Sequence, residues 1–326
     1  MRTNRYRYSE LLERASLPPA DEHTMDYLYA IVDEGVLGAS RHVQLTQKLF
    51  LHLMHTEDNQ EVAWQKIKLA GKLIADTRGV DTPIIGNSIR WLLRDLDGHD
   101  SGHVLKTLNE RTSSWQKESK QRLDKILAVG DAVLGNAPTI LAYDYSSTVA
   151  AVVKHKHSRE PQTTVIVPES RAIDGGKPYL EEFVSAGIKV RFILDIAIEH
   201  VMPDVMAVLL GVESLRCDGS FLNTIGSRTV ARTAKLLAVP TYACTDLYKL
   251  DLRSYQGHMK TPSLRSYHER LLSHSSVASE EEVTTDAPEL EVIGPELHTG
   301  FLTEYGLVPP QSIWSLGRSV FPEITA

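Results

Sequence analysis

Cysteine is scarce in this chain, and the two that occur lie far from any pattern of metal or redox chemistry. Cys217 and Cys244 are the only cysteines among 326 residues, and neither belongs to a paired motif of a zinc site or a dithiol. A chain of this kind fits a reducing compartment, so we expect a cytoplasmic protein without a metal site.

Long apolar runs are also missing. Nowhere do about 18 uncharged apolar residues follow one another, as a membrane-spanning helix requires. The basic N-terminus leads into Ser9-Glu10-Leu11-Leu12 and not into the apolar stretch of a signal peptide. We therefore expect no association with a membrane.

An excess of basic charge is absent as well. The chain carries 35 Lys and Arg against 42 Asp and Glu, a formal net charge of −7. Such a balance offers no positive field for a phosphate backbone, so direct binding of nucleic acid is not expected. The 42% share of hydrophobic residues is that of a folded globular protein.

The first part of the chain has the apolar spacing of helices. From residue 6 to about 135, apolar residues recur every three or four positions, as in Leu45, Leu49 and Leu53. Residues 103–134 have the pattern of one long helix that links the two halves of the chain. We predict a helical domain over residues 1–135.

After Gly135 the period changes to short apolar runs that alternate with helical segments. The predicted strands are 139–143, 163–167, 190–194, 205–210 and 241–244, and the predicted helices between them are 147–156, 178–186 and 228–237. This alternation is typical of a doubly wound parallel sheet, so residues 136–326 are predicted to form a Rossmann-like α/β domain. The polar segment near 254–288 is interpreted as an insertion or a flexible loop.

Polar side chains follow the predicted strands at their carboxyl ends. Asp144 comes after the first strand, Arg171 after the second and Glu213 after the fourth. Ligands of parallel sheets bind beyond this edge, where an arginine suits a phosphate and a carboxylate suits acid/base work or a sugar hydroxyl. The alternative for Asp144 is that it caps the helix that follows it.

Other candidates are weaker individually. The turn of residues 223–227, which contains Asn223, leads into a helix whose free amides would attract an anion. Gly38 and Ala39, together with Arg78, would place small residues and one more arginine at a cleft, although such residues more often serve helix packing. Cys217 lies four residues beyond Glu213 and is an alternative thiol, but a lone cysteine there is more often a packing residue.

These motifs, in this order, resemble the family that unites the regulatory subunits of initiation factor 2B with methylthioribose-1-phosphate isomerase and ribose-1,5-bisphosphate isomerase. Residues 210–227 are similar to its Gly-Ala-Asp/Glu strand end and its Asn-Lys-Ile-Gly-Thr turn, and residues 298–310 to its closing segment. Further matches are residues 168–171, 38–41 and 77–78 with Asn87.

The resemblance implies a helical N-terminal domain, a Rossmann-like C-terminal domain that associates into a homodimer or larger homo-oligomer, and no cofactor. It also implies a sugar-phosphate pocket between the domains, with Gly38, Ala39, Arg78, Arg171 and Asn223 as binding residues. In the family's isomerases a cysteine and an aspartate transfer the proton from aldose to ketose without a metal, and these positions fall on Asp144 and Glu213 of this chain.

Two interpretations follow from that difference. The first is an initiation-factor-2B-like protein that binds a sugar phosphate or nucleotide without turning it over, since the thiol is absent. The alternative is a metal-independent aldose-to-ketose isomerase in which Asp144 and Glu213 form an acid/base pair. Thr224 stands where the family has its turn lysine, which leaves Arg78 and Arg171 for one phosphate and argues against a bisphosphate.

Overall fold

A computed structural model describes residues 21–32, 39–273 and 283–321 of the chain. The chain divides into two compact units, Met1–Gln121 and Arg122–Ala326, which are described one at a time. Within the described residues, no helix has both the length and the apolar character needed to cross a membrane.

Unit 1 is helical, as the spacing of its apolar residues predicts. Its helices are α2 (Glu22–Val32), α3 (Ala39–Thr56), α4 (Gln60–Asp76), α5 (Arg78–Asp81), α6 (Pro83–Leu93) and the first part of α7 (Ser101–Leu134). Asn59 caps α4, because its side chain accepts hydrogen bonds from the backbone N–H groups of Glu61 and Val62. Proline stands at the first position of α6, where its missing N–H costs nothing.

The core of unit 1 forms where the apolar faces of α2, α3, α4 and α6 meet. Leu28, Phe50 and Ile67 are fully buried there. The rings of Trp91 in α6 and Trp115 in α7 lie 5.4 Å apart, and this contact packs the first half of the long helix against the bundle.

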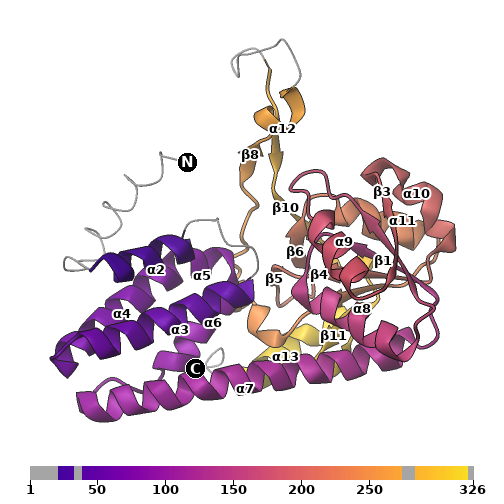
Figure 1. The fold of residues 1–326 in the computed structure, drawn as a ribbon. Coiled ribbons are helices and arrows are strands. Elements are labelled where there is room, and N and C mark those ends of the chain that lie inside the picture. The colour runs from indigo at the N-terminus through magenta and orange to yellow at the C-terminus, as the bar shows by residue number, and fades with distance from the viewer. Residues whose placement is uncertain (1–20, 33–38, 274–282, 322–326) are drawn as a thin grey trace. The chain divides into compact units, whose positions relative to one another are not determined.

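Unit 2 is built on a seven-stranded sheet (Figure 1). Its strands lie in the order β12 (Gly306–Val308), β11 (Gly300–Thr303), β7 (Thr241–Cys244), β4 (Ala207–Gly211), β1 (Thr139–Tyr143), β2 (Thr164–Pro168) and β3 (Lys189–Ile193). All neighbours are parallel except β11 and β12. The predicted doubly wound α/β fold is therefore confirmed.

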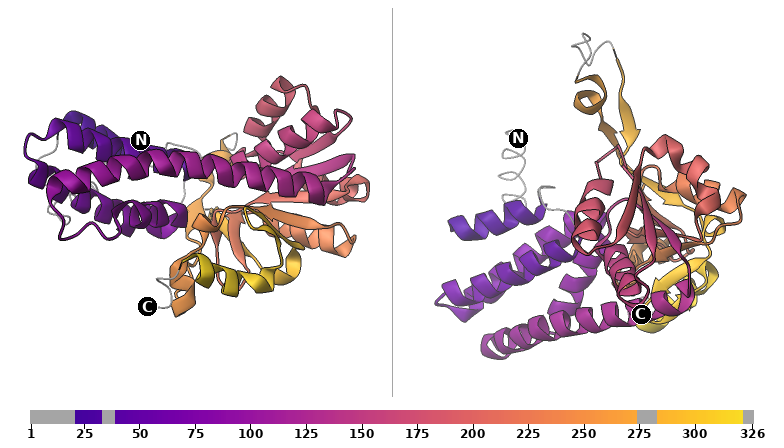
Figure 2. Two further views of the ribbon diagram at one scale, coloured as in Figure 1. Left: turned by 90° about the horizontal axis from the view of Figure 1, so that it is seen from below. Right: turned by 45° about the vertical axis from the view of Figure 1, so that its right-hand side comes forward.

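Helices cover both faces of this sheet (Figure 2). Alternate residues of β1 enter opposite cores: Ile140 packs with the core of α7, α8 and α9, and Leu141 with the core of α10, α11 and α13. The bounds of the helices after α7 are α8 (Ser147–Arg159), α9 (Gly176–Ser185), α10 (Ile198–Val201), α11 (Ser227–Leu236), α12 (His268–Leu272) and α13 (Ile313–Val320).

Several smaller elements were not predicted. β5 (Ser214–Leu215), β6 (Phe221–Thr224) and β10 (Leu290–Ile293) form a second sheet, and β8 (Leu264–Ser266) pairs with β9 (Asp286–Pro288). The short 3-10 helices are η1 (Asp195–Ala197), η2 (Met202–Asp204), η3 (Leu247–Lys249), η4 (Leu252–Gln256), η5 (Pro295–Leu297) and η6 (Pro310–Ser312). The polar segment near 254–288 thus contains regular structure in its described residues.

Candidate functional site

The strand order of unit 2 changes direction between β1 and β4, which are neighbours in the sheet. The helix that follows β1 packs on one face, and α11, which precedes β7, packs on the other. In doubly wound sheets ligands bind at this point, beyond the carboxyl ends of the two strands. Asp144 directly follows β1, and Glu213 lies two residues after β4.

Asp144 is a buried carboxylate held by two hydroxyl groups. The Ser170 Oγ donates a hydrogen bond of 2.8 Å to its Oδ1, and the Thr224 Oγ1 donates one of 2.7 Å to its Oδ2. Burial raises the pKa of Asp144 to about 6, and the charge of Glu213 adds to the rise while the two hydroxyls oppose it. A carboxyl group of this kind changes its protonation close to neutral pH.

The alternative role of Asp144 as a helix cap does not hold. Ser146 is the N-cap of α8, and its side chain accepts from the N–H of Val149 at 3.4 Å. Asp144 itself has a positive φ of 56°, and its two carboxylate oxygens accept from Ser170 and Thr224.

The loop after β2 supplies one of these hydroxyls. Asp195 fixes this loop from one side, because its carboxylate accepts from the backbone N–H groups of Ser170 and Arg171 at 2.9 and 2.7 Å. Gly175 lies so close to the site that a Cβ atom there would stand 1.9 Å from the Asp144 Oδ1. Only glycine allows the loop to approach the carboxylate in this way.

Arg171 presents its guanidinium to solvent at the same edge. Its side chain is 62% exposed, and its Nη1 lies 3.9 Å from the Glu169 Oε2. Such a side chain is available to a phosphate, as the sequence predicts, and its backbone is already fixed by Asp195.

The end of β6 supplies the second hydroxyl. Thr224 is buried and reaches Asp144, while the neighbouring Asn223 donates from its Nδ2 to the Ser227 Oγ at 3.0 Å. Asn223 is therefore adjacent in β6 to the residue that bonds to Asp144.

The amides at the start of α11 are not free, which corrects the prediction of an anion site there. The Glu291 Oε1 accepts from the N–H groups of Gly226 and Arg228 at 2.7 and 2.8 Å. Its Oε2 lies 3.2 Å from the Arg228 Nε. A carboxylate of the protein, which is itself buried, therefore takes the place that a helix N-terminus would offer to a ligand anion.

The remaining predicted residues lie away from Asp144 in unit 2, in unit 1, or outside the described residues. Cys217 is buried, its N–H donates to the Ser254 Oγ, and burial raises the pKa of its thiol, which disfavours a reactive thiolate. Ala39 begins α3 and Arg78 begins α5, both in unit 1. Gly38 lies outside the described residues.

Sequence reasoning missed four residues that shape the site: Ser170, Thr224, Asp195 and Glu291. Ser170 and Thr224 lie within quoted motifs, and a hydroxyl next to a strand-end carboxylate is the signal that would have found them. Asp195 and Glu291 carry no such signal, because each acts on a loop more than 20 residues away in sequence.

A second pair of carboxyl groups lies at the same edge, after β7 and β11. Arg122 of α7 places its Nε 3.5 Å from the Asp246 Oδ2, and the N–H of Leu247 donates to the Glu304 Oε1 at 3.2 Å. Burial and the charge of Asp246 raise the pKa of Glu304 to about 7. In the described part of the chain, no three His, Cys, Asp or Glu side chains are arranged to hold a metal ion.

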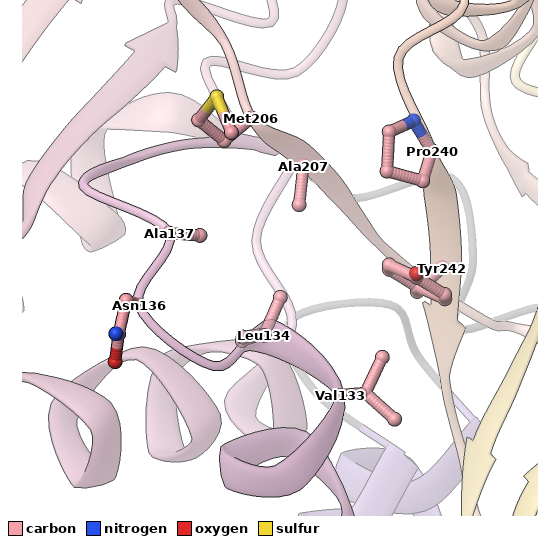
Figure 3. Close-up of a pocket in the computed structure, with 8 residues that line it drawn as sticks. All are labelled: Val133, Leu134, Asn136, Ala137, Met206, Ala207, Pro240 and Tyr242. Carbon is pink, nitrogen blue, oxygen red and sulfur yellow. The ribbon is translucent and has the colours of Figure 1, made fainter.

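Unit 2 also has a hollow at the opposite edge of the sheet (Figure 3). It has a volume of 310 Å³ and lies where α7 ends and where β4 and β7 begin. The lining residues are Val133, Leu134, Asn136, Ala137, Met206, Ala207, Pro240 and Tyr242. It is mostly apolar and lies away from Asp144, so it offers no group for the chemistry considered above.

The sequence of this chain is similar to those of an isomerase and of an initiation-factor subunit. Ribose 1,5-bisphosphate isomerase of Thermococcus kodakarensis is 26% identical over 270 residues, which cover 81% of this chain and 83% of that protein. Translation initiation factor eIF2B subunit alpha of Caenorhabditis elegans is 26% identical over 218 residues, 67% of this chain and 70% of that protein.

Solved structures share the fold. The 5-methylthioribose 1-phosphate isomerase of Pyrococcus horikoshii OT3 superimposes with a TM-score of 0.75 at 20% identity, covering 91% of this chain and 88% of that one. The Initiation factor 2 subunit family matches residues 39–310, which include most of unit 1 and all the strands of unit 2. The chain belongs to the Initiation factor 2 subunit family.

Proposed function

We propose that this protein is an isomerase that converts a phosphorylated aldose into the corresponding ketose. The observation that carries the proposal is the Asp144 carboxyl, which is buried after β1 and held by Ser170 and Thr224, and whose pKa is raised to about 6 by burial, with a contribution from the charge of Glu213 after β4. A carboxyl group poised close to neutral pH serves both as a proton acceptor and as a proton donor.

In the proposed reaction Asp144 moves a proton between the first two carbons of the sugar. A proton leaves C2, and a proton joins C1, so the carboxyl group ends in its starting state. The 2-hydroxyl loses its proton as C2 becomes a carbonyl. In an aldose 1-phosphate the bond between C1 and the ring oxygen breaks and that oxygen gains a proton, while the phosphate stays on C1. Glu213 is assigned this exchange between oxygens, and no atom or electron is lost or gained overall.

Ser170 and Thr224 adapt to both states of Asp144. Their hydroxyls donate to the ionised carboxylate, and a hydroxyl also accepts when the carboxyl is protonated. Arg171 is the phosphate-binding group that unit 2 offers at this edge. Asn223 is assigned to a sugar hydroxyl, and Gly38, Ala39 and Arg78 of unit 1 to the remainder of the phosphate.

The alternative of binding without turnover has less support. Relatives named as ribose 1,5-bisphosphate isomerase match over four fifths of the chain, whereas the eIF2B alpha relative matches over two thirds. The absence of a thiol at position 144 is offset by a carboxyl group that titrates in the useful range.

A substrate panel tests the proposal. The purified chain is incubated with ribose 1,5-bisphosphate, 5-methylthioribose 1-phosphate and simple pentose and hexose 1-phosphates, and proton NMR in deuterated water follows each mixture. We expect one aldose phosphate to become its ketose, and Asp144→Asn and Glu213→Gln to lower kcat by about 10²-fold or more, as is usual for an acid/base group.

Glu181→Gln is the matched control, since this glutamate is exposed on α9, and its kcat is expected to match the wild type. Thermal shift shows whether each variant still binds. Stabilisation by a sugar phosphate or nucleotide without conversion of any panel member would replace the isomerase proposal with the binding interpretation.

We also propose that the chain acts in the cytoplasm as a homodimer associated through unit 2. Two free, buried cysteines suit a reducing compartment, and the eIF2B alpha relative is by name a subunit of an assembly. Light scattering after size exclusion is expected to give twice the chain mass of 36.3 kDa, and cell fractionation to recover the protein in the soluble fraction. A measured mass of 36.3 kDa, that of a single chain, would contradict the proposed dimer.

A further inference from the structure

A hairpin segment of unit 2 contacts the loop that carries Ser170. The hairpin segment consists of β8, α12 and β9, which follow one another before β10 (Figure 1). From α12, Arg270 reaches back almost 100 residues in sequence to the loop after β2. This contact connects a polar surface segment with the site.

Arg270 holds the loop through two different groups. Its Nη1 donates to the backbone carbonyl of Arg171 at 2.9 Å and lies 2.8 Å from the Asp174 Oδ2. Asp174 has a positive φ of 56°, and its ion pair with Arg270 helps to hold that unfavourable backbone conformation. The loop between these two points is thereby fixed at both ends.

The fixed loop is the one that shapes the surroundings of Asp144. Ser170 precedes Arg171 and donates to the Asp144 Oδ1, and Gly175 follows Asp174 and lies against the same oxygen. Asp195 holds the loop from the β3 side, so Arg270 completes a clamp around it. A shift of the loop would change the hydrogen bond at Asp144 directly.

The residues directly after the hairpin segment support the second hydroxyl. Directly after β9, the Glu289 carbonyl accepts from the N–H of Ile225 at 2.9 Å, and Leu290 pairs with Thr224 across β10 and β6. Thr224 donates to the Asp144 Oδ2. The bond from Ser170 thus comes from a loop that the hairpin segment contacts, and the bond from Thr224 comes from a strand that pairs with the residues directly after the segment.

We propose that Arg270 is a positioning residue for Asp144, acting through the Ser170–Gly175 loop. It does not touch the reacting groups itself. Its catalytic consequence rests on the proposed isomerase function, but its effect on the Asp144 carboxyl does not.

Other charged and titratable groups lie around Asp144, and they belong to elements other than the hairpin segment. The charge of Glu213, after β4, raises the pKa of Asp144, and the charge of Asp144 in turn raises the pKa values of Tyr143 in β1 and Tyr179 in α9. None of these groups belongs to the hairpin segment. Arg270→Gln removes a positive charge as well as the contacts with the loop, so Arg270→Lys, which keeps the charge, separates the two effects.

The test is a carboxyl titration by carbon NMR with 13C-labelled aspartate, using Asp144→Asn to identify the Asp144 signal. In Arg270→Gln we expect the titration midpoint of Asp144 to move to higher pH, because a weakened bond from Ser170 favours the protonated form. Lys177→Gln is the control: its ammonium lies 3.3 Å from the same Asp174 carboxylate but holds no loop carbonyl, so the midpoint should stay in place.

An unchanged midpoint in a folded Arg270→Gln overturns the proposal, as does an equal shift in Lys177→Gln. Circular dichroism establishes folding, and Arg270→Lys, which keeps one donor, provides a second variant with an expected intermediate midpoint. If the wild type isomerises a sugar phosphate, Arg270→Gln should lower kcat about tenfold, as loss of a hydrogen bond to a charged group would, and move the acidic limb of the pH profile upward. If the wild type turns over nothing, the proposed function fails while the titration still decides the role of Arg270.

Discussion

Asp144 combines two opposing influences on one carboxyl group. Burial favours the neutral form, and hydrogen bonds from Ser170 and Thr224 favour the ionised form. The balance is a pKa of about 6, above the ordinary value of 3.8. Since the folded pKa is raised, this group's contribution to stability is largest below pH 3.8 and is lost as the pH rises through about 6.

Replacement of Thr224 by valine should increase the loss of stability at high pH. Thr224→Val keeps the shape of the side chain but removes the donor to the Oδ2, so the pKa of Asp144 should rise further. We expect a cost of about 1.5–3 kcal/mol at pH 8, where Asp144 is ionised, and a smaller cost at pH 5. Urea unfolding at the two pH values measures both.

Thr224→Ser serves as the control, because it retains the hydroxyl. It should show little difference between pH 5 and pH 8 relative to the wild type. An equal cost of Thr224→Val at both pH values would mean that the hydroxyl does not discriminate between the two forms of Asp144.

At the level of single residues, the sequence predicted the strand-end carboxylates but not the groups that hold them. Asp144 and Glu213 follow apolar runs that are visible in the sequence. The role of Glu291 arises only when β10 pairs with β6 and brings it to the first turn of α11. Local patterns contain no information about such a pairing.

The elements of unit 2 were predictable where their apolar runs were long. β1 and β7 have the predicted bounds, and the helices α8, α9 and α11 were found within a few residues. β11 and β12 were not predicted as strands, since they are only four and three residues long and each begins with glycine. Pairing makes them strands, and not a local preference, because β11 pairs with β7 and β12 pairs with β11.

The second half of α7 contacts the loops after β7 and β11 through charged groups. Arg122 lies over the ring of Tyr248 at 4.5 Å and forms an ion pair with Asp246. Glu304 is buried beside Asp246, so its ionised form suffers both loss of hydration and repulsion.

This arrangement predicts a pH dependence of stability. The pKa of Glu304 is raised from 4.5 to about 7, so its contribution is fully present below pH 4.5 and is lost as the pH rises through 7. Glu304→Gln, which mimics the neutral acid, should be more stable than the wild type at pH 8, by up to about 3 kcal/mol. Denaturant unfolding from pH 5 to pH 8 measures the difference.

Glu199→Gln is the matched control for Glu304→Gln, because Glu199 is exposed on α10. Its unfolding free energy should follow that of the wild type at every pH. A Glu304→Gln variant whose stability also parallels the wild type would show that the buried pair does not titrate in this range.

For the whole molecule, the change in the spacing of apolar residues correctly predicted a helical part followed by an α/β part. The period changes near residue 135, where α7 ends, whereas the compact units divide between Gln121 and Arg122, inside the same helix. The helical spacing of apolar residues continues through α7 from one unit into the other. The spacing therefore marks the end of the helix and not the division between the units. The family match spans both units.

The carboxylate of Glu291 at the start of α11 affects any anion that approaches this turn. A tethered group competes as if it were present at a high local concentration, on the order of millimolar or more. A phosphate would have to displace it from Gly226 and Arg228 and also leave Glu291 buried without those donors. The resting fold therefore keeps an internal competitor at this turn, which an incoming anion would have to displace and an uncharged group would not.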